Sequence, residues 1–236
     1  DAVLACEAGS TKSAIAFFSN FGVAYTMRVI DVPATTGYGE PIQKFFKLKD
    51  GERIVGALSL DPRAIGDITE DPKKPDLCPT THGLAVTSDG FALRFGLAPF
   101  AEVSTRSGRR YARPAGDAEV IFCDAVHGKE IVIAASRERR AILTRADEVN
   151  YLGGPGKGVM LIKLERDDRL IGAILADDDS DTLVVKTSMG GEQRINTAKY
   201  KPVGRGGKGH EVIKRGQLLE VIREAPAQPA LLEEGD

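Results

Sequence analysis

The sequence of 236 residues lacks the features that mark several large classes of protein. Its three cysteines are an odd number and do not form the framework of a small disulfide-rich secreted protein, so a reducing cytoplasm is the expected compartment. No apolar run approaches the ~18 residues that a membrane-spanning helix needs. No N-terminal segment has the form of a signal peptide, and the chain begins at Asp1 rather than Met, as a piece of a longer polypeptide would.

A nucleotide-binding loop is also missing, although glycine and lysine occur together twice. A P-loop needs Gly-x-x-x-x-Gly-Lys followed by Ser or Thr, because that hydroxyl binds Mg²⁺. Here Gly207-Lys208 is followed by Gly209, and Gly156-Lys157 is followed by Gly158. We therefore expect no nucleotide, and no other cofactor, in this domain.

A metal site is not predicted either. Cys78 with His82 and Cys123 with His127 form two Cys-x-x-x-His pairs, but their spacing is not that of a zinc finger. Cys123 lies in an apolar segment, where a buried free thiol is common. The acidic run Asp177–Asp181 has the composition of a solvated turn.

What the sequence does contain is an internal repeat. The segments Gly154–Lys163 and Gly206–Lys214 align on a Gly-Lys-Gly core that places Lys157 and Lys208 51 residues apart. A third copy, Gly37–Lys44, has its glycines in the same frame. Self-similarity at a period of about 50 residues is typical of a repeat architecture.

Each glycine-rich segment follows an apolar run, a tight polar turn and an alternating strand, which together predict a β-hairpin. The turns centre on Gly22, Gly90, Arg139 and Gly190, and the arginine is the one departure from glycine. Four short strands per ~50 residues describe a propeller-like blade. The fold class is therefore all-β, with about four to five blades and repeats at roughly 11–60, 81–130, 131–176 and 180–222. Residues 61–79 are expected to be an inserted surface loop.

Four segments of these repeats resemble a known protein family. "FFSNFGVAYTMRVIDVPATTGYGEPIQKFFKLKDGERI", "SDGFALRF", "GPGKGV" and "VGRGGKGHEVIKRG" resemble the C-terminal domain of the A subunit of bacterial DNA gyrase and topoisomerase IV, the type IIA topoisomerases. The element Gly204–Gly209 looks like the basic box loop of that family. The resemblance covers residues 1–222 and implies a β-pinwheel, in which neighbouring blades exchange strands and duplex DNA wraps around the rim.

The resemblance also implies what this domain does not do. The catalytic tyrosine, the Mg²⁺ site and the ATP site of such topoisomerases lie outside it, so the chain is not expected to be an enzyme on its own. Its expected partners, in the bacterial cytoplasm, are duplex DNA, the remainder of the A subunit, and the ATPase partner subunit. Tyr111 follows Arg110, as in a cleavage site, but we expect it to be a packed or DNA-facing residue.

Two departures from the family pattern leave the parent activity open between gyrase and topoisomerase IV. The strongest box of the family usually lies in the first blade, whereas here it lies in the last repeat, with Val203-Gly204 where Gln and Arg would stand. The copy at Gly37 has lost its cations, so little DNA contact is expected there. Residues 223–236 are predicted to be a flexible acidic tail. A hypothesis from charge alone is that Glu233, Glu234 and Asp236 compete with DNA.

The predicted DNA contacts are cations that recur in one phase of the repeat. Most protein–DNA hydrogen bonds go to phosphate, and glycine lets backbone N–H groups approach it closely. The formal net charge of −2 requires the cations to be concentrated on one side of the molecule. The candidates are Arg205, Lys208, Lys157, Arg106, Arg109, Arg110, Arg113, Lys201, Lys214 and Arg215.

Three alternatives remain open at this stage. The cations could form a solvated surface that binds nothing. The chain could be a protein-interaction β-propeller, a scaffold without DNA binding, which a near-neutral net charge favours. It could also be a propeller enzyme with a site in the central channel, although three histidines offer few groups for one.

Overall fold

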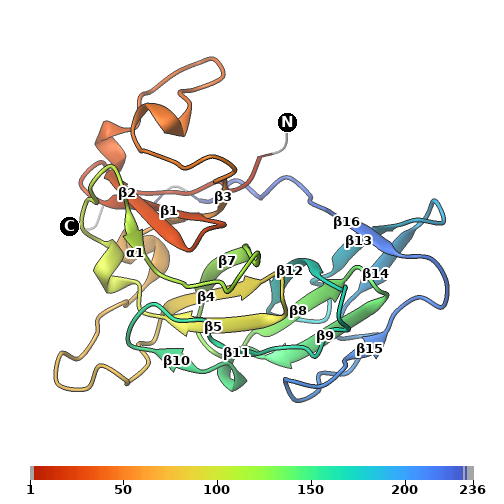
Figure 1. Ribbon diagram of the computed structural model, residues 1–236. Helices are drawn as coiled ribbons and strands as arrows, with labels where there is room; N and C mark the ends of the chain where they lie inside the picture. The colour runs from red at the N-terminus through yellow and green to blue at the C-terminus, as the bar shows by residue number, and fades with distance from the viewer. Residues whose placement is uncertain (1–2, 231, 233–236) are drawn as a thin grey trace.

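The structure, a computed structural model, describes residues 3–230 and 232. Glu233, Glu234 and Asp236, for which competition with DNA was hypothesised, lie outside the described residues. Within that range sixteen strands form four sheets that follow one another around the molecule (Figure 1). The predicted all-β, propeller-like class is therefore correct. None of the helices in the described part is long and apolar enough to cross a membrane.

Each repeat supplies three antiparallel strands to a sheet of its own, which we call a blade. Blade 1 contains β1 (Ala14–Ser19), β2 (Val23–Arg28) and β3 (Ile54–Ser59). Blade 2 contains β4 (His82–Thr87), β5 (Phe91–Phe95) and β7 (Val120–Val126). Blade 3 contains β8 (Ile131–Ser136), β9 (Arg140–Arg145) and β12 (Leu170–Ala176). Blade 4 contains β13 (Leu183–Thr187), β14 (Glu192–Ile195) and β16 (Leu218–Ile222).

The glycine-rich segments leave their own blades. β6 (Arg109–Arg110) pairs with β2, β11 (Val159–Met160) pairs with β5, and β15 (His210–Glu211) pairs with β9. Each is thus the outer strand of the preceding repeat's sheet. Of the apolar segment 159–164, only Val159–Met160 forms a strand, and that strand extends blade 2. In the described chain, the sheet of blade 4 has three strands and no exchanged strand.

In blades 1 to 3, the turn at the outer tip of the hairpin holds the exchanged strand. The carbonyl of Gly22 accepts hydrogen bonds from the N–H groups of Tyr111 and Ala112, at 2.9 and 3.2 Å. Gly90 accepts from Leu161 and Ile162 at 2.8 and 3.2 Å in the same way. A Cβ at Gly22, whose φ is 75°, would lie 2.3 Å from the Ala112 carbonyl oxygen, so the close approach requires glycine there.

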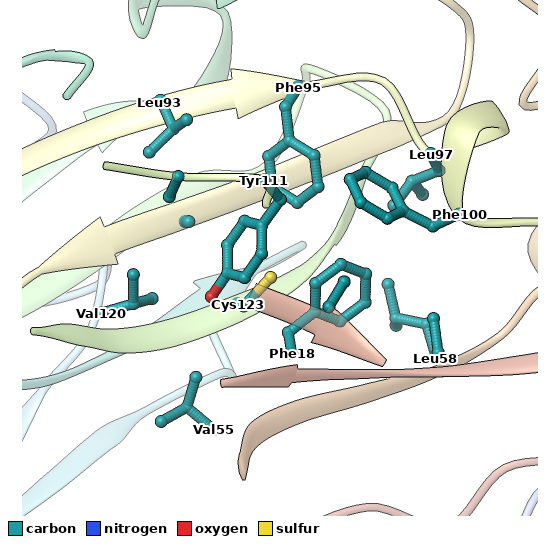
Figure 2. Packing of buried hydrophobic residues seen from close by; sticks show 14 of the residues in the cluster. Phe18, Val55, Leu58, Leu93, Phe95, Leu97, Phe100, Tyr111, Val120 and Cys123 are labelled. Carbon is teal, nitrogen blue, oxygen red and sulfur yellow. The ribbon is translucent and has the colours of Figure 1, made fainter. Parts of the chain in front are cut away.

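The exchanged segment also supplies core. Tyr111, which is 1% exposed, enters the core between blades 1 and 2, where Figure 2 shows its ring among Phe18, Phe95 and Cys123. Its ring centroid lies 5.1 Å from that of Phe18 and 5.0 Å from that of Phe95. Its hydroxyl donates to the Ser19 carbonyl at 2.8 Å, and burial raises its pKa well above the ordinary value. Tyr111 is a packing residue, as expected.

The remaining elements are short and connect the blades. β10 (Tyr151–Leu152) adds to β5 in parallel. The 3-10 helices are η1 (Val29–Asp31), η2 (Ile42–Lys44), η3 (Ala98–Phe100) and η4 (Ala146–Glu148). The predicted insertion contains the single turn α1 (Pro62–Ile65), whose N-cap Asp61 accepts a hydrogen bond from Arg63 N–H.

The inner edges of the sheets face one another. β3, β7, β12 and β16 line a cavity of about 550 Å³, together with the N-terminal segment Val3–Glu7. Residues 223–230, predicted to be a flexible tail, contain no strand, and Gln228 and Pro229 lie beside Cys6–Thr11 in a second hollow. The tail's flexibility stays a prediction.

Replacing Tyr111 should test how much the exchanged strand contributes to stability. We expect Tyr111→Ala to lower the free energy of unfolding by about 3–5 kcal/mol, because it leaves a cavity beside the rings of Phe18 and Phe95. Tyr111→Phe removes only the hydroxyl and should cost about 1 kcal/mol, since Ser19 O also accepts from Gly22 N–H. Urea unfolding followed by circular dichroism measures both; equal small losses would mean that the exchanged strand is not anchored by this ring.

Candidate functional site

Loops from consecutive repeats lie against one another along the outer edge of the molecule. Lys47 N–H donates to Arg106 O at 2.7 Å, and Arg113 N–H donates to Gly156 O at 2.8 Å. Further along, Gly206 N–H donates to Leu161 O at 2.7 Å, and Lys163 N–H donates to Gly207 O at 2.8 Å. These bonds join the loops of residues 44–47, 104–113, 154–163 and 201–215 into one continuous surface, which we call the loop band.

Strand exchange explains why the band is continuous. Each glycine-rich loop crosses to the outer edge of the preceding blade, so it ends beside the loop that the preceding repeat contributed. The glycines at the start of the three exchanged strands, Gly108, Gly158 and Gly209, all have positive φ. A Cβ at Gly158 would lie 2.1 Å from the Ala92 carbonyl oxygen, so this crossing requires glycine. Cations far apart in the sequence are thereby brought together.

Some predicted site residues already bind the protein itself. The Arg205 guanidinium donates to the carbonyls of Glu148 and Met160, at 2.7 and 3.3 Å. Arg106 donates to Phe45 O and Lys44 O, at 3.2 and 3.3 Å. These arginines hold adjacent loops of the band together, so they organise the surface.

Other candidates are balanced by nearby groups. Lys208 lies 3.3 Å from a Glu165 carboxylate oxygen. The Lys157 ammonium lies 3.7 Å from the centroid of the Phe91 ring and 3.6 Å from Asp89. The Arg110 guanidinium donates to the carbonyls of Phe21 and Ala112. A phosphate at any of these positions would compete with a contact that already exists.

The other half of the predicted set is available to a ligand. Within residues 3–230, these exposed cations have no side-chain hydrogen bond or ion pair: Arg109, Arg113, Lys201, Lys214 and Arg215. Arg109 lies in the exchanged strand β6 and Arg113 follows it, whereas Lys214 and Arg215 follow the exchanged strand β15. Such a band can bind a polyanion through phosphate-like groups. That these residues contact DNA stays a prediction.

The first repeat differs from the others in structure as well as charge. Its segment Gly37–Lys44 pairs with no described sheet, and Ile42–Lys44 forms the helix η2 instead. Lys44 forms an ion pair with Glu40 at 3.0 Å. The expectation of little DNA contact here stays a prediction.

Sequence reasoning missed a group of arginines at the outer tip of blade 3. The Arg139 guanidinium donates to Lys214 O at 3.1 Å, and that of Arg140 donates to Lys208 O at 3.4 Å. Both arginines therefore lie on the fourth loop of the band. The one signal in the sequence was the arginine that replaces glycine in the third turn. Taken alone, that substitution only weakens the repeat pattern and does not indicate a binding site.

The central cavity, lined by β3, β7, β12 and β16, contains titratable groups. Its carboxylates include Asp124, whose pKa is raised to about 6 by burial, and Glu7, whose pKa is also raised by burial. Glu7 accepts a hydrogen bond from Ser59 N–H at 3.0 Å. Over residues 3–230 and 232, no group of three or more His, Cys, Asp or Glu residues is arranged to hold a metal ion.

His82, a member of one Cys-x-x-x-His pair, packs inside the protein with both ring nitrogens close to protein groups. Its ring nitrogens lie 3.0 Å from Pro79 O and 3.2 Å from the Arg94 guanidinium. Burial, assisted by Arg94, lowers its pKa to about 4, so the ring is neutral at pH 7. These contacts attach the insertion to blade 2.

The comparison with protein families matches two of the repeats. Residues 14–61 and 130–177 match the family described as DNA gyrase C-terminal domain, beta-propeller. The chain is 28% identical over 228 residues to the A subunit of DNA gyrase from Helicobacter pylori, covering 90% of this chain and 25% of that protein. It is 25% identical over 214 residues to the A subunit of DNA gyrase from Staphylococcus epidermidis, covering 89% and 22%. The chain thus spans about a quarter of the length of these relatives.

Solved structures show the same fold. The C-terminal domain of DNA topoisomerase IV matches with a TM-score of 0.76 at 17% identity, over 90% of this chain and 64% of that one. The C-terminal domain of DNA gyrase A matches with 0.64 at 20% identity, over 92% and 67%. The E. coli ParC C-terminal domain matches with 0.68 at 16% identity, over 92% and 84%. Together these findings confirm the resemblance and the β-pinwheel fold predicted from the sequence.

Arg205 and Lys201 should differ in their effect on stability. We expect Arg205→Ala to lower the free energy of unfolding by about 1 kcal/mol, because two loop carbonyls lose a charged donor. Lys201→Ala should change it by less than about 0.5 kcal/mol, since its side chain has no protein partner among the described residues. Thermal unfolding of both variants checks the difference; an equal effect would contradict the division into engaged and free cations.

Asp124 should make stability depend on pH. Its pKa is higher in the folded protein than in the unfolded chain, so folding favours the protonated form, and stability should fall as the pH rises from about 4 to about 6. Asp124→Asn should weaken that dependence and stabilise the protein at pH 7.5, by roughly 1–3 kcal/mol. Urea unfolding at several pH values measures this. A variant less stable than the wild type at pH 7.5 would contradict the burial of an unfavourable charge.

Proposed function

We propose that this chain, a relative in sequence and fold of the C-terminal domains of DNA gyrase and topoisomerase IV A subunits, binds duplex DNA without sequence preference and bends it along the loop band. The observation that carries the proposal is the continuity of the band. Free cations from repeats 2 and 4 lie on loops that are hydrogen-bonded to the loop of repeat 3 between them. A curved duplex could therefore contact several repeats at once.

The chemistry of the free cations suits a phosphate backbone. Arg109, Arg113 and Lys214 are exposed, so they can bind a phosphate without losing a protein contact. Each neutralised phosphate releases counterions, which gives a slope of log K against log salt of about −0.9 per contact. Phosphate contacts carry no base sequence, so the binding is sequence-independent.

Bending requires that the contacts be distributed along an arc. Bending a duplex of 20–30 bp costs of order 1–6 kcal/mol, more than one surface ion pair supplies. The exchanged strands β6, β11 and β15 pair with blades 1, 2 and 3, so the loops that carry the cations belong to three successive blades. Several contacts made together can offset the bending energy.

The similarity to A subunits of DNA gyrase and to topoisomerase IV supports a biological role. We infer that the chain acts in the bacterial cytoplasm as part of the A subunit of an ATP-dependent type II topoisomerase, either gyrase or topoisomerase IV. There it would present a bent DNA segment to the cleavage core, with the ATPase partner and the remainder of the enzyme supplying the chemistry. The domain needs no cofactor for this role and does not catalyse a reaction alone.

The double variant Arg109→Ala/Arg113→Ala tests the proposal. Fluorescence anisotropy with a duplex of about 30 bp should show tight, salt-dependent binding by the wild type. The variant should bind roughly 10- to 100-fold more weakly at about 0.1 M salt, with a slope smaller by nearly 2, because two phosphate contacts are lost. Its thermal stability should be unchanged.

A matched control removes two cations from other connections. Lys12 and Lys129 are exposed and lie at the ends of strands opposite the hairpin turns. Lys12→Ala/Lys129→Ala changes the net charge by the same amount and should keep wild-type affinity. Equal weakening by both double variants would mean that binding depends on the overall charge of the protein and not on the position of its cations. No binding by the wild type would instead favour the protein-interaction scaffold.

A further inference from the structure

The turn of blade 3 is built differently from the other three. Arg139 has a φ of 71° and is the one residue other than glycine with positive φ in the described chain. The corresponding turn positions in blades 1, 2 and 4 are Gly22, Gly90 and Gly190, with φ between 75° and 85°. Positive φ is unfavourable for a residue with a Cβ, so arginine destabilises a turn that glycine would form freely.

The arginine side chain is not needed to hold the exchanged strand. That strand is fixed by the Arg139 backbone carbonyl, which accepts a hydrogen bond from Val212 N–H at 2.9 Å. Gly22 and Gly90 supply the same carbonyl to their own exchanged strands. Within the described residues, the side chain makes one hydrogen bond to the protein, from one guanidinium nitrogen to Lys214 O, so further N–H donors remain for a ligand.

The surroundings of Arg139 are strongly cationic. The turn and the loop exchanged onto it bring together six cations: Arg137, Arg139, Arg140, Lys208, Lys214 and Arg215. Four carboxylates lie among them: Glu138, Glu211, Glu165 and Asp168, which accepts a hydrogen bond from Glu138 N–H at 3.0 Å. Glu138 accepts a hydrogen bond from the Gln217 side chain, and Glu165 forms an ion pair with Lys208. Glu211 lies opposite Arg140 in the register of β15 and β9. The positive charge therefore exceeds the negative charge at this tip.

Blade 2 provides the contrast. Its turn carries Asp89 next to Gly90, and the exchanged loop brings Lys157, which pairs with Asp89 and covers Phe91. The cation there is neutralised within the protein. Blade 4 has no exchanged loop in the described chain, and no described atom lies within 4 Å of a Cβ at Gly190.

We propose that Arg139 is a phosphate-binding residue, and that the outer tip of blade 3 is a built DNA contact of the loop band. This inference rests on the proposed function and deepens it, because it names a residue that the protein holds in an unfavourable backbone conformation for binding phosphate. Arg139, Arg140 and Lys214 form the centre of this contact. The positive φ of Arg139 destabilises the turn, and the side chain that it exposes binds the phosphate.

The variant Arg139→Gly separates binding from folding. Glycine suits the positive φ and retains the carbonyl that holds the exchanged strand, so thermal stability should be unchanged or higher. Affinity for a duplex of about 30 bp should fall roughly five- to tenfold at about 0.1 M salt, and the salt slope should decrease by about 0.9. A structural role for the side chain would instead lower the melting temperature.

Relocating the charge provides the control. Arg139→Gly/Gly190→Arg keeps the net charge and moves the arginine to the turn of blade 4, where a side chain has open space. It should bind DNA as weakly as Arg139→Gly; recovery of wild-type affinity would overturn the proposal, because position would not matter. If Arg139→Gly binds like the wild type while Arg109→Ala/Arg113→Ala is weakened, this inference fails and the proposed function stands. If the wild type binds no DNA, the proposed function itself fails.

Discussion

The structure depends on one backbone interaction, in which the carbonyl at the tip of a hairpin accepts N–H groups from a strand of the next repeat. At Gly22 and Gly90 the same carbonyl accepts two such bonds, and at Arg139 it accepts one. Because each bond crosses from one repeat to another, no complete blade of the first three can form alone. The same bonds fix the position of each glycine-rich loop, so core packing and surface arrangement have a common cause.

The surface that results divides its cations between two roles. Arg205 and Arg106 donate to carbonyls of adjacent loops and thereby hold the band together. Arg109 and Arg113 extend from that framework without a protein partner among the described residues. A framework held by engaged cations keeps the free ones at defined positions, which lowers the entropy lost when they bind a rigid polyanion. The near-neutral composition of the chain is compatible with this, because several carboxylates, among them Glu7, Asp124 and Asp181, line the central cavity and not the loop band.

Much of the fold was predictable from local pattern. Positive-φ residues at the turns and alternating strands on either side predicted the hairpins, and glycines in one frame predicted the repeat. Strand exchange was not predictable from spacing, because the residues of Val159–Met160 suit a strand but do not determine which sheet it joins. The expectation of strand exchange came only from the family resemblance. The environment of Arg205 was likewise hidden, since Glu148 and Met160 are 57 and 45 residues away in sequence. Arg139 was visible in the sequence as a departure from glycine. Its proposed role as a phosphate contact required its φ and its neighbours in the structure.

The central claim is that the loops form a single curved track and not a set of separate charged spots. The linking number of nicked circular DNA, sealed by ligase in the presence of increasing amounts of the protein and then deproteinised, tests this most directly. The account predicts a linking-number change that grows with bound protein and disappears at high salt, its sign giving the handedness of the bend. Saturating binding with no change in linking number would contradict it.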